Sequence, residues 1–541
     1  MHQSLGLILV QACSVPKDKY SKMESLFFSA LGSSCLLLIL YCVLRTFNSI
    51  WWKPKILEKH LKQQGIGGTS YKFLYGDMKD LKRMMTEAWS KPMALSHQIA
   101  PRVNPFYHQM VQNHVDVCDV GKISVAWIET RPRLIVADPE LMRLILVDKQ
   151  GHFQKPPVNP LVDLLTLGVS TLERQKWAKR RKLISPAFHH EKIQGMLPAF
   201  SDSCYKLING WKKLVGSQES YELDIASELQ NLSADVIARS AFGSSLEEGK
   251  KIFELRKEQV VLVIEASQAL YIPGLRFLPT KKNKRRYEID NEIKCMLRNM
   301  IQKKEVAVQN GEPFGDDLLG LLLQCKGELD NEMTTEDVIE ECKLFYFAGQ
   351  ETTANWLTWT IIVLSMHPNW QDKAREEVLQ SCGKNKPDLE TINHLKIVSM
   401  ILQEVIRLYP PVTGQFRHTY RRTNIGGMSI PADVEIFLPT LLLHHDTRYW
   451  GDDVHEFRPE RFSEGVPKAF FPFGWGPRFC LGQSFAMLEA KLALAMILQN
   501  FSFELSPSYM HAPYTTITLQ PQHGAPVILH QLYFSCFCRS E

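Results

Sequence analysis

The longest uncharged apolar stretch of the chain lies near its start, over residues 26–44. A helix of 19 residues is about 28 Å long, close to the ~30 Å hydrocarbon core of a bilayer. Trp51 and Trp52 follow it, where interfacial aromatic residues belong. A cleaved signal peptide would have a shorter apolar core and would end in small residues. The pattern therefore predicts a transmembrane anchor over 26–44.

The anchor divides the chain into four parts. Residues 1–25 form an N-terminal tail. Residues 1–22 are either an upstream extension, because a natural start methionine follows them, or a short lumenal tail. Residues 45–70 form a linker, and we expect a flexible joint at its glycine-rich end, 65–70.

Five basic residues closely follow the anchor and three precede it, so the positive-inside rule places the body, residues 71–541, in the cytosol.

Helical periodicity dominates the body, with few strand patterns. The strongest helical patterns cover 336–366, 395–409 and 483–499. Short β-like runs cover 122–128, 133–137 and 434–439. Because no change of composition divides the body, the pattern predicts one mainly α domain with small β-sheets.

Charge and cysteine content narrow the function classes. The chain has 63 Lys and Arg against 58 Asp and Glu, and a net charge of +5 is too small to favour nucleic acid as a partner. The basic run at 281–286 predicts a solvated loop. The 12 cysteines lack the regular close spacing of a disulfide framework, so we expect reduced thiols in a cytosolic domain.

One cysteine stands in unusual company, in the stretch FPFGWGPRFCLG over 471–482. Cys480 lies just before a helical pattern, where free N–H groups stabilise a thiolate. Gly476 and Gly482 would let backbone approach the sulfur, and Phe473 and Trp475 offer flat apolar surfaces. A single thiolate, flat walls and a nearby arginine suit a haem bound by one axial cysteine, although a lone cysteine among apolar residues is more often a core residue.

The order Phe473-x-x-Gly476-x-Arg478-x-Cys480-x-Gly482 resembles the haem-binding signature of the cytochrome P-450 family at every fixed position. A zinc or iron–sulfur site would need several cysteines, and this loop has one. The resemblance implies the cytochrome P-450 fold behind an N-terminal transmembrane helix. It also implies haem b, with Cys480 as the axial iron ligand.

Further motifs occur in the family's order. Trp177-x-x-x-Arg181 lies in a basic helical stretch and resembles the pair that binds the haem propionates, although alone it would indicate a basic surface helix. The resemblance adds other residues to the haem contacts. The expected cofactor-binding set is Trp177, Arg181, Arg417, Phe473, Arg478 and Cys480. The remaining cations of the stretch, Lys176, Lys179, Arg180 and Lys182, would help to dock an acidic redox partner.

Two more motifs resemble structural and catalytic features of the family. Glu404-x-x-Arg407, with Arg461, resembles its Glu-Arg-Arg triad, which holds the fold and does no catalysis. The stretch from Ala348 to Thr353 lies inside the longest helical pattern and resembles the oxygen groove. Glu351 and Thr352 would then be catalytic and deliver protons to oxygen, and the Thr352 hydroxyl can bond back to the carbonyl of Ala348. The alternative is a helix-packing glycine.

Longer strings resemble a plant clan that oxidises terpenoids and steroids, in particular its secologanin-synthase-like branch. The stretch 465–470, just before the haem loop, is shorter than in such relatives, which would weaken haem retention. By the same resemblance, segments 151–172, 412–415 and 514–516 would line the substrate pocket. The expected substrate-binding residues are Phe347, Ala348, Val412, Thr413, Gln415 and Thr515.

Together these features predict a single-pass membrane protein of the endoplasmic reticulum with a cytosolic catalytic domain. It would hydroxylate or further oxidise a hydrophobic plant terpenoid or steroid, with O2 and electrons that an NADPH-dependent flavoprotein reductase supplies. One alternative is a haem-thiolate isomerase or dehydratase that needs no O2, which the presence of Glu351 and Thr352 disfavours. Another is a non-catalytic haem-binding membrane protein.

Overall fold

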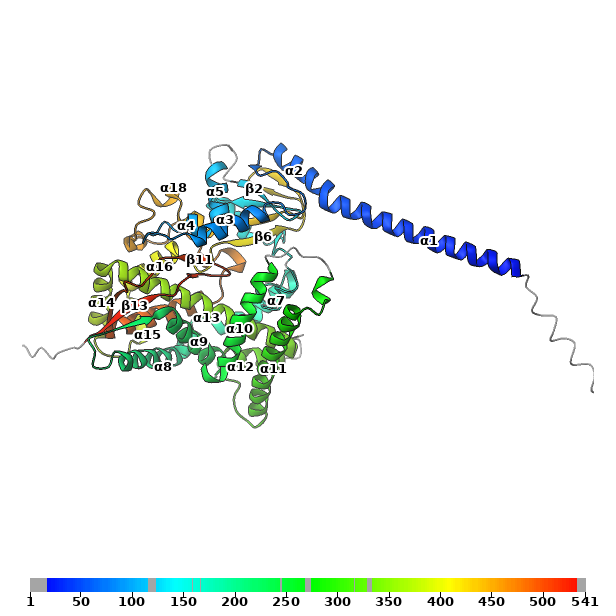
Figure 1. Ribbon diagram of the computed structural model, residues 1–541. Helices are drawn as coiled ribbons and strands as arrows, with labels where there is room; N and C mark the ends of the chain where they lie inside the picture. Colours follow the sequence, from blue (N-terminus) through cyan, green and yellow to red (C-terminus); the bar gives the residue numbers. More distant parts are fainter. Residues whose placement is uncertain are drawn as a thin grey trace, which may run out of the picture.

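The computed structural model describes residues 17–114, 123–157, 159–165, 167–243, 246–267, 274–315, 317–327 and 333–532. Most of this part of the chain is helical, as predicted, and it has small sheets. Figure 1 shows the sheet that contains β2 and β6 beside α2 and α3, with most of the other helices on the opposite side of the body. The predicted N-terminal tail lies largely outside the described residues.

The α-helices are α1 (Lys17–Phe47), α2 (Lys53–Gln63), α3 (Met78–Ser90), α4 (Ala100–Val103), α5 (Pro105–His114), α6 (Pro139–Val147), α7 (Arg174–Ile184), α8 (His190–Val215), α9 (Ile225–Phe242), α10 (Leu246–Ser267), α11 (Lys281–Gln309), α12 (Leu318–Gly327), α13 (Thr335–Met366), α14 (Pro368–Cys382), α15 (Leu389–His394), α16 (Lys396–Leu408), α17 (Thr440–His444), α18 (Thr447–Trp450) and α19 (Gln483–Asn500). The short helical turns are η1 (Asn48–Trp52), η2 (Ser185–Phe188), η3 (Leu275–Phe277), η4 (Pro459–Phe462) and η5 (Gly476–Arg478).

The main sheet has six strands in the order β1-β2-β3-β9-β6-β4. Its strands are β1 (Gly67–Gly68), β2 (Ile123–Ile128), β3 (Arg131–Val136), β4 (Phe153–Gln154), β6 (Gln415–Thr419) and β9 (Glu435–Leu438). A three-stranded sheet joins β10 (Phe501–Leu505), β13 (Pro526–Gln531) and β5 (Ser220–Asp224). Two hairpins pair β7 (Thr423–Ile425) with β8 (Met428–Ile430), and β11 (Pro513–Thr515) with β12 (Leu519–Pro521).

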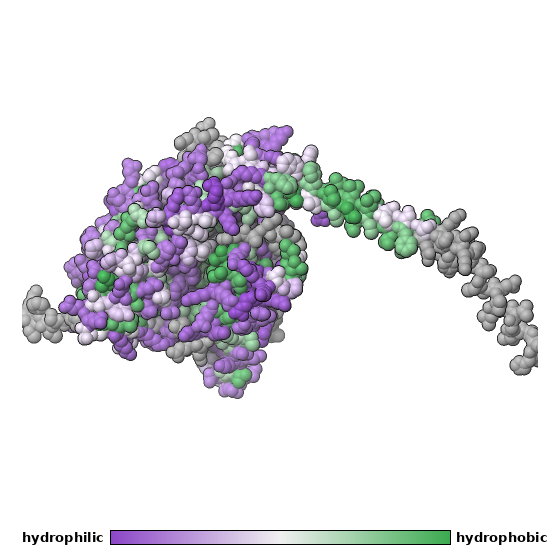
Figure 2. Space-filling model, viewed as in Figure 1, coloured by the Kyte–Doolittle hydropathy of each residue, from purple (hydrophilic) through white to green (hydrophobic). Residues whose placement is uncertain are grey.

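The predicted anchor lies within α1, which projects away from the body (Figure 1). Through the π-helical turn η1 it continues into α2, so residues Ser25–Gln63 form one helix of 39 residues. In the described part of the chain it is the one helix long and apolar enough to cross a membrane. Its apolar window is not buried against the body, whereas Leu57 and Leu61 near its C-terminal end are buried. Figure 2 shows apolar side chains gathered along this helix, whereas the visible face of the body is mostly hydrophilic.

The glycine-rich stretch after α2 is not a flexible joint, contrary to our expectation. Gly67 and Gly68 form β1, which pairs with β2 in parallel. A side chain at Gly68 would lie 2.0 Å from the carbonyl oxygen of Val125, so the glycine serves a close backbone contact. Tyr71 then packs edge-on against Trp127 at 5.1 Å. The linker is therefore bound to the sheet.

The three predicted helices are confirmed as α13, α16 and α19, and the predicted strands as β2, β3 and β9. The helix α13 begins with a capping box, in which the Thr334 hydroxyl and the Asp337 carboxylate each satisfy the other residue's backbone N–H. The prediction of a loop at 281–286 is wrong, because these residues form the first turns of α11. Thr280 caps that helix, and Lys282 and Arg285 form ion pairs with carboxylates of α10.

Candidate functional site

Cys480 lies between η5 and the start of α19, in the loop where the sequence places it. Its backbone N–H donates to the carbonyl of Phe473 at 2.8 Å, which closes the loop. Burial raises the pKa of the Cys480 thiol, while a hydrogen bond from the Gly482 backbone and the charge of Arg181 act in the opposite direction. Cys480 nevertheless keeps accessible surface.

The glycines and aromatic residues of this loop have separate tasks. Gly476 has φ +69°, and a side chain there would lie 2.3 Å from the carbonyl oxygen of Leu146, so it serves a close contact with α6 and not with the sulfur. The ring of Phe473 packs edge-on against Trp356 of α13 at 5.9 Å. Arg143 of α6 lies 4.6 Å from the ring centre of Trp475, so one face of this ring is covered.

A cluster of cations gathers beside the loop. The Arg478 guanidinium lies 4.5 Å from the ring centre of Trp177, and the Arg181 guanidinium lies 4.8 Å from that of Phe479. Burial, together with the charge of Arg478, lowers the pKa of Arg417 to about 10. Trp177, Arg417 and Arg478 line one pocket of about 770 Å³. Four residues of the expected cofactor-binding set, Trp177, Arg181, Arg417 and Arg478, thus lie around one site.

Two residues of this cluster, Lys155 and Glu173, were not in the expected cofactor-binding set. Burial and the charges of Arg417 and Arg478 lower the pKa of Lys155 to about 7. Glu173 accepts a hydrogen bond from Arg478 at 2.6 Å and another from the backbone N–H of Lys155 at 2.8 Å. Lys155 lies 22 residues before Trp177, outside any motif, and only the fold brings them together.

This cluster provides a test of whether a haem fits. Buried cations are costly unless they are paired, and Glu173 is the only carboxylate that the described contacts place among Lys155, Arg417 and Arg478. The described contacts of Arg417 include a hydrogen bond to the carbonyl of Phe416 but no ion pair. The excess positive charge therefore fits a ligand with carboxylates next to Cys480, and haem propionates are such carboxylates.

The expected docking role of Arg180 is wrong. Its guanidinium turns inward and forms ion pairs at 2.8 Å with Asp337 and with the buried Glu341 of α13. The same Glu341 carboxylate accepts the backbone N–H of Val169 at 3.1 Å. Arg180 therefore ties α7 to α13. Lys176, Lys179 and Lys182 remain exposed on α7.

The residues predicted to form the oxygen groove lie in the middle of α13. The Thr352 hydroxyl donates to the carbonyl of Ala348 at 2.7 Å, as predicted. Gly349 packs against α9, since a side chain there would lie 2.7 Å from Ile237. The Glu351 carboxylate accepts from the Thr518 hydroxyl at 2.8 Å. Gly349 is thus a helix-packing glycine, and Thr352 makes the same kind of bond to the i−4 carbonyl as Thr358 and Thr360 further along α13.

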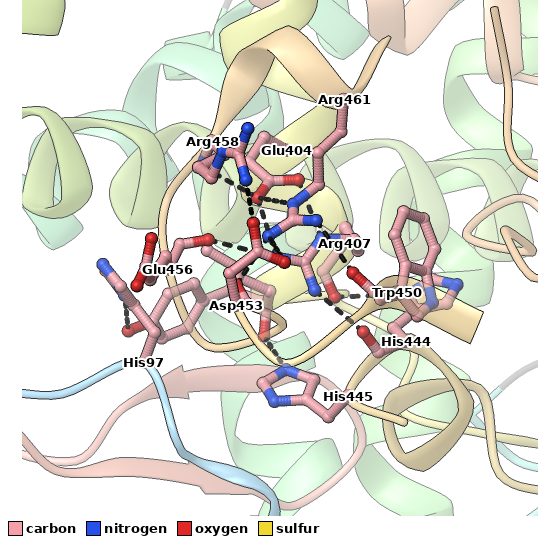
Figure 3. Close-up of polar contacts among 12 residues, drawn as sticks. His97, Glu404, Arg407, His444, His445, Trp450, Asp453, Glu456, Arg458 and Arg461 are labelled. Atoms are coloured by element: carbon pink, nitrogen blue, oxygen red, sulfur yellow. Dashed lines mark hydrogen bonds and ion pairs between the residues drawn. The ribbon is translucent and has the colours of Figure 1, made fainter. Parts of the chain in front are cut away.

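The structure brings the Glu-Arg-Arg residues together (Figure 3). Arg407 and Glu404, both fully buried, form a bidentate pair with two contacts of 2.7 Å. Arg461 lies 3.5 Å from the same carboxylate and 2.8 Å from Asp453, which the sequence did not single out. Arg407 also donates to the carbonyl of His444 at 2.9 Å. A buried pair with this many hydrogen bonds fixes the surrounding chain.

The expected substrate-binding residues lie on three elements. Phe347 and Ala348 are on α13, one turn before Thr352. Val412, Thr413 and Gln415 lie between α16 and β6 and at the start of β6. Gln415 faces the haem loop, since a side chain at Gly474 would lie 3.3 Å from its Oε1. The last member, Thr515, is in β11.

The short stretch before the haem loop is packed at its C-terminal end, where Ala469 and Phe470 are buried. Phe470 is buried, stacks on His444 at 5.3 Å and lies 4.9 Å from the ring of Phe462. Arg143 of α6 donates to the carbonyl of Lys468. These contacts hold the stretch against α17, η4 and α6 despite its length.

Comparison of the sequence with known proteins identifies its family. The family model described as "Cytochrome P450" matches residues 92–525. Cytochrome P450 CYP72A616 of Paris polyphylla is 51% identical and the match covers 94% of this chain and 100% of that protein. Cytochrome P450 CYP72A219 of Panax ginseng is 49% identical, over 94% of this chain and 99% of that protein. Secologanin synthase 1 of Catharanthus roseus is 47% identical, over 93% and 98%. With its cysteine loop and the cations around it, the chain belongs to the cytochrome P450 family of monooxygenases.

Proposed function

We propose that this protein hydroxylates or further oxidises a hydrophobic plant terpenoid or steroid, with O2 and electrons that an NADPH-dependent flavoprotein reductase supplies. The observation that carries the proposal is the set of under-compensated cations beside Cys480. The relatives support its direction, because secologanin synthase 1 and secologanin synthase 2 of Catharanthus roseus are among them.

In this proposal Cys480 holds the iron of haem b, and Arg181, Arg417 and Arg478 hold the propionates with Trp177. Phe473 would contact the porphyrin. A haem with a thiolate ligand supplies the O2 chemistry, because the thiolate increases electron density at the iron and favours O–O cleavage. The chain's own residues bind and orient the substrate, exclude water and deliver protons.

Proton delivery falls to Glu351 and Thr352. The Thr352 hydroxyl donates to Ala348, so its oxygen lone pairs remain available to accept from water. Glu351, the preceding residue, can exchange protons with such water. Neither an isomerase nor a dehydratase that works without O2 needs this pair.

The substrate site is formed by Phe347 and Ala348 of α13, by Val412, Thr413 and Gln415, and by Thr515. Phe347, Ala348 and Val412 would supply apolar walls, which suit a terpenoid or steroid skeleton. The hydroxyls of Thr413 and Thr515 and the amide of Gln415 would bind an oxygenated group of the substrate.

The anchor, residues 26–44, holds the protein in the endoplasmic reticulum membrane, and the body, residues 71–541, faces the cytosol beside the reductase. The exposed lysines of α7, Lys176, Lys179 and Lys182, would attract an acidic partner surface. Removal of residues 1–22 should leave targeting and activity unchanged, because the anchor does not depend on them. Protease should digest the body in sealed microsomes, and protection would reverse the orientation.

Product analysis tests the proposal most directly. Microsomes with co-expressed reductase are incubated with a panel of terpenoids and sterols, and products are identified by mass spectrometry. We expect NADPH- and O2-dependent gain of oxygen by one panel member. Product without NADPH would favour the isomerase or dehydratase. Absence of a thiolate-type CO spectrum would favour a protein without this catalysis.

A further inference from the structure

The Glu351 carboxylate is held by residues outside the oxygen groove. Its Oε1 accepts from the Thr518 hydroxyl at 2.8 Å and from the Asn355 amide at 3.2 Å. The same amide nitrogen lies 3.0 Å from the Thr518 hydroxyl oxygen. Thr518 and Asn355 are each 3% exposed, so water does not compete for these bonds.

The two oxygens of this carboxylate are used differently. The described residues give Oε1 two donors and give Oε2 none. Because two donors from different elements hold Oε1 in place, the position of Oε2 is also fixed. A proton donor must be placed within hydrogen-bond reach of its acceptor, so a fixed rotamer favours transfer.

Thr518 comes from a segment that would also touch the substrate. It lies in the turn between β11 and β12, three residues after Thr515. Burial, and then the charge of Glu351, raise the pKa of Tyr514, the residue before Thr515, so this hairpin lies near the acid. A movement of the hairpin would therefore displace the Thr518 hydroxyl that donates to Glu351.

On the α13 side the network continues to α9. Gln230 of α9 donates its amide to Asn355 at 3.4 Å, and Gln350 of α13 donates to the Gln230 carbonyl at 3.4 Å. These contacts hold Asn355 in the rotamer that reaches Glu351. The acid is thus supported from both sides of α13.

We infer that Thr518, with Asn355, is a positioning residue that holds Glu351 in the rotamer needed for proton delivery, and that the β11–β12 hairpin links substrate contact to this rotamer. The inference rests on the proposed function of Glu351. It assigns no chemical step to Thr518 itself.

The first test measures the contact without reference to activity. The unfolding equilibria of the holoenzyme with Thr518→Val, Glu351→Gln and both changes form a double-mutant cycle. A lost hydrogen bond to a charged group corresponds to about a tenfold change or more in an equilibrium constant. We expect a coupling of about tenfold between the two sites. Independent effects would overturn the inference.

The second test measures proton delivery in reductase-containing microsomes, with cholesterol and oleanolic acid as probe substrates and NADPH. We expect Thr518→Val to lower product per NADPH about tenfold and to raise hydrogen peroxide, with an unchanged CO spectrum. Thr518→Ser keeps the hydroxyl and should restore both. In the Glu351→Gln background, Thr518→Val should cause no further loss.

The control removes a buried hydroxyl with no such task. Thr440 is 1% exposed and its hydroxyl has no partner among the described residues, so Thr440→Val should leave product per NADPH unchanged. If Glu351→Gln lowers product per NADPH and Thr518→Val does not, the inference fails alone. If Glu351→Gln has no effect, the proposed role of Glu351 fails first and the inference fails with it.

Discussion

His444 accepts a hydrogen bond from the backbone N–H of Phe471, the first residue of the haem loop, at 3.0 Å. Because its Nε2 accepts there, its Nδ1 carries the proton and donates to the carbonyl of Arg407 at 3.2 Å. One neutral imidazole thus joins the Glu404–Arg407 pair to the loop that carries Cys480. It gives the Glu-Arg-Arg residues a direct mechanical link to the haem site.

Replacement of His444 by Phe should break this link. The Phe471 N–H and the Arg407 carbonyl would lose their partner, and each buried unsatisfied group costs about 1–3 kcal/mol. We expect a fall of at least about 2 kcal/mol in the free energy of unfolding and faster loss of haem absorbance on heating. His394→Phe, at an exposed position of α15, should change neither, and equal behaviour of the two variants would contradict the link.

Cys480→Ser should remove the thiolate ligand. The reduced CO complex would then lose its thiolate-type spectrum, and NADPH-dependent product should vanish. Cys342→Ser and Cys382→Ser are matched controls, because both thiols are buried away from the loop and burial raises their pKa. A thiolate-type spectrum in Cys480→Ser would refute the ligand assignment.

Thr352→Ala should uncouple electron consumption from oxidation. Loss of a group that acts in proton transfer typically reduces the rate about 10²–10⁴-fold. NADPH oxidation should persist, product should fall by about 10² or more, and hydrogen peroxide should rise, while the CO spectrum stays normal.

The control is Thr360→Ala, which removes the same kind of helix bond two turns further along α13, from the Thr360 hydroxyl to the Trp356 carbonyl at 2.8 Å. It should leave product per NADPH intact. If both variants lose product equally, the effect belongs to helix packing and not to proton delivery.

Buried histidines should make the fold acid-sensitive. Burial lowers the pKa of His97 to about 3, that of His444 to about 3 and that of His511 to about 4. An unfolded histidine has a pKa of about 6.5, so between the two values the unfolded chain binds more protons. Stability from these groups is complete above pH 6.5 and is lost as the pH falls toward 4.

His97 provides the measurement. It hydrogen-bonds the Tyr409 hydroxyl and His367, both at 2.9 Å, and each such group adds a slope of about 1.4 kcal/mol per pH unit in this window. His97→Gln should therefore give a shallower fall of unfolding free energy between pH 6.5 and 4. An unchanged slope would show that His97 is not buried in its neutral form.

Much of the fold and the ligand loop could be predicted because their signals are local. The periodicity over 336–366 predicts the helix that forms α13, and the Thr352 bond to Ala348 needs only the i−4 geometry of that helix. The order of residues around Cys480 likewise lies in one short stretch.

The wrong predictions have a common cause, because contacts with residues distant in the sequence determine these parts of the structure. Arg180 was predicted to help dock a redox partner, but it pairs with Glu341, which lies 161 positions away in the sequence. The basic run at 281–286 was predicted to be a loop, but it is helical and forms ion pairs with carboxylates of α10. Lys155 and Thr518 belong to no motif and matter only through neighbours that the fold supplies.

The unbroken helix from Ser25 to Gln63 has a mechanical consequence. Lys53 of α2 forms an ion pair with Asp433 at 2.6 Å, and the Tyr71 hydroxyl donates to the carbonyl of Ile50, so the helix end is clamped to the body. A clamped helix acts as a lever arm. When a bilayer thicker or thinner than the apolar segment forces it to tilt, the whole catalytic body must rock by the same angle. Membrane thickness would then set how the body leans on the lipid surface, and a helix-breaking insertion after residue 48 would abolish that dependence.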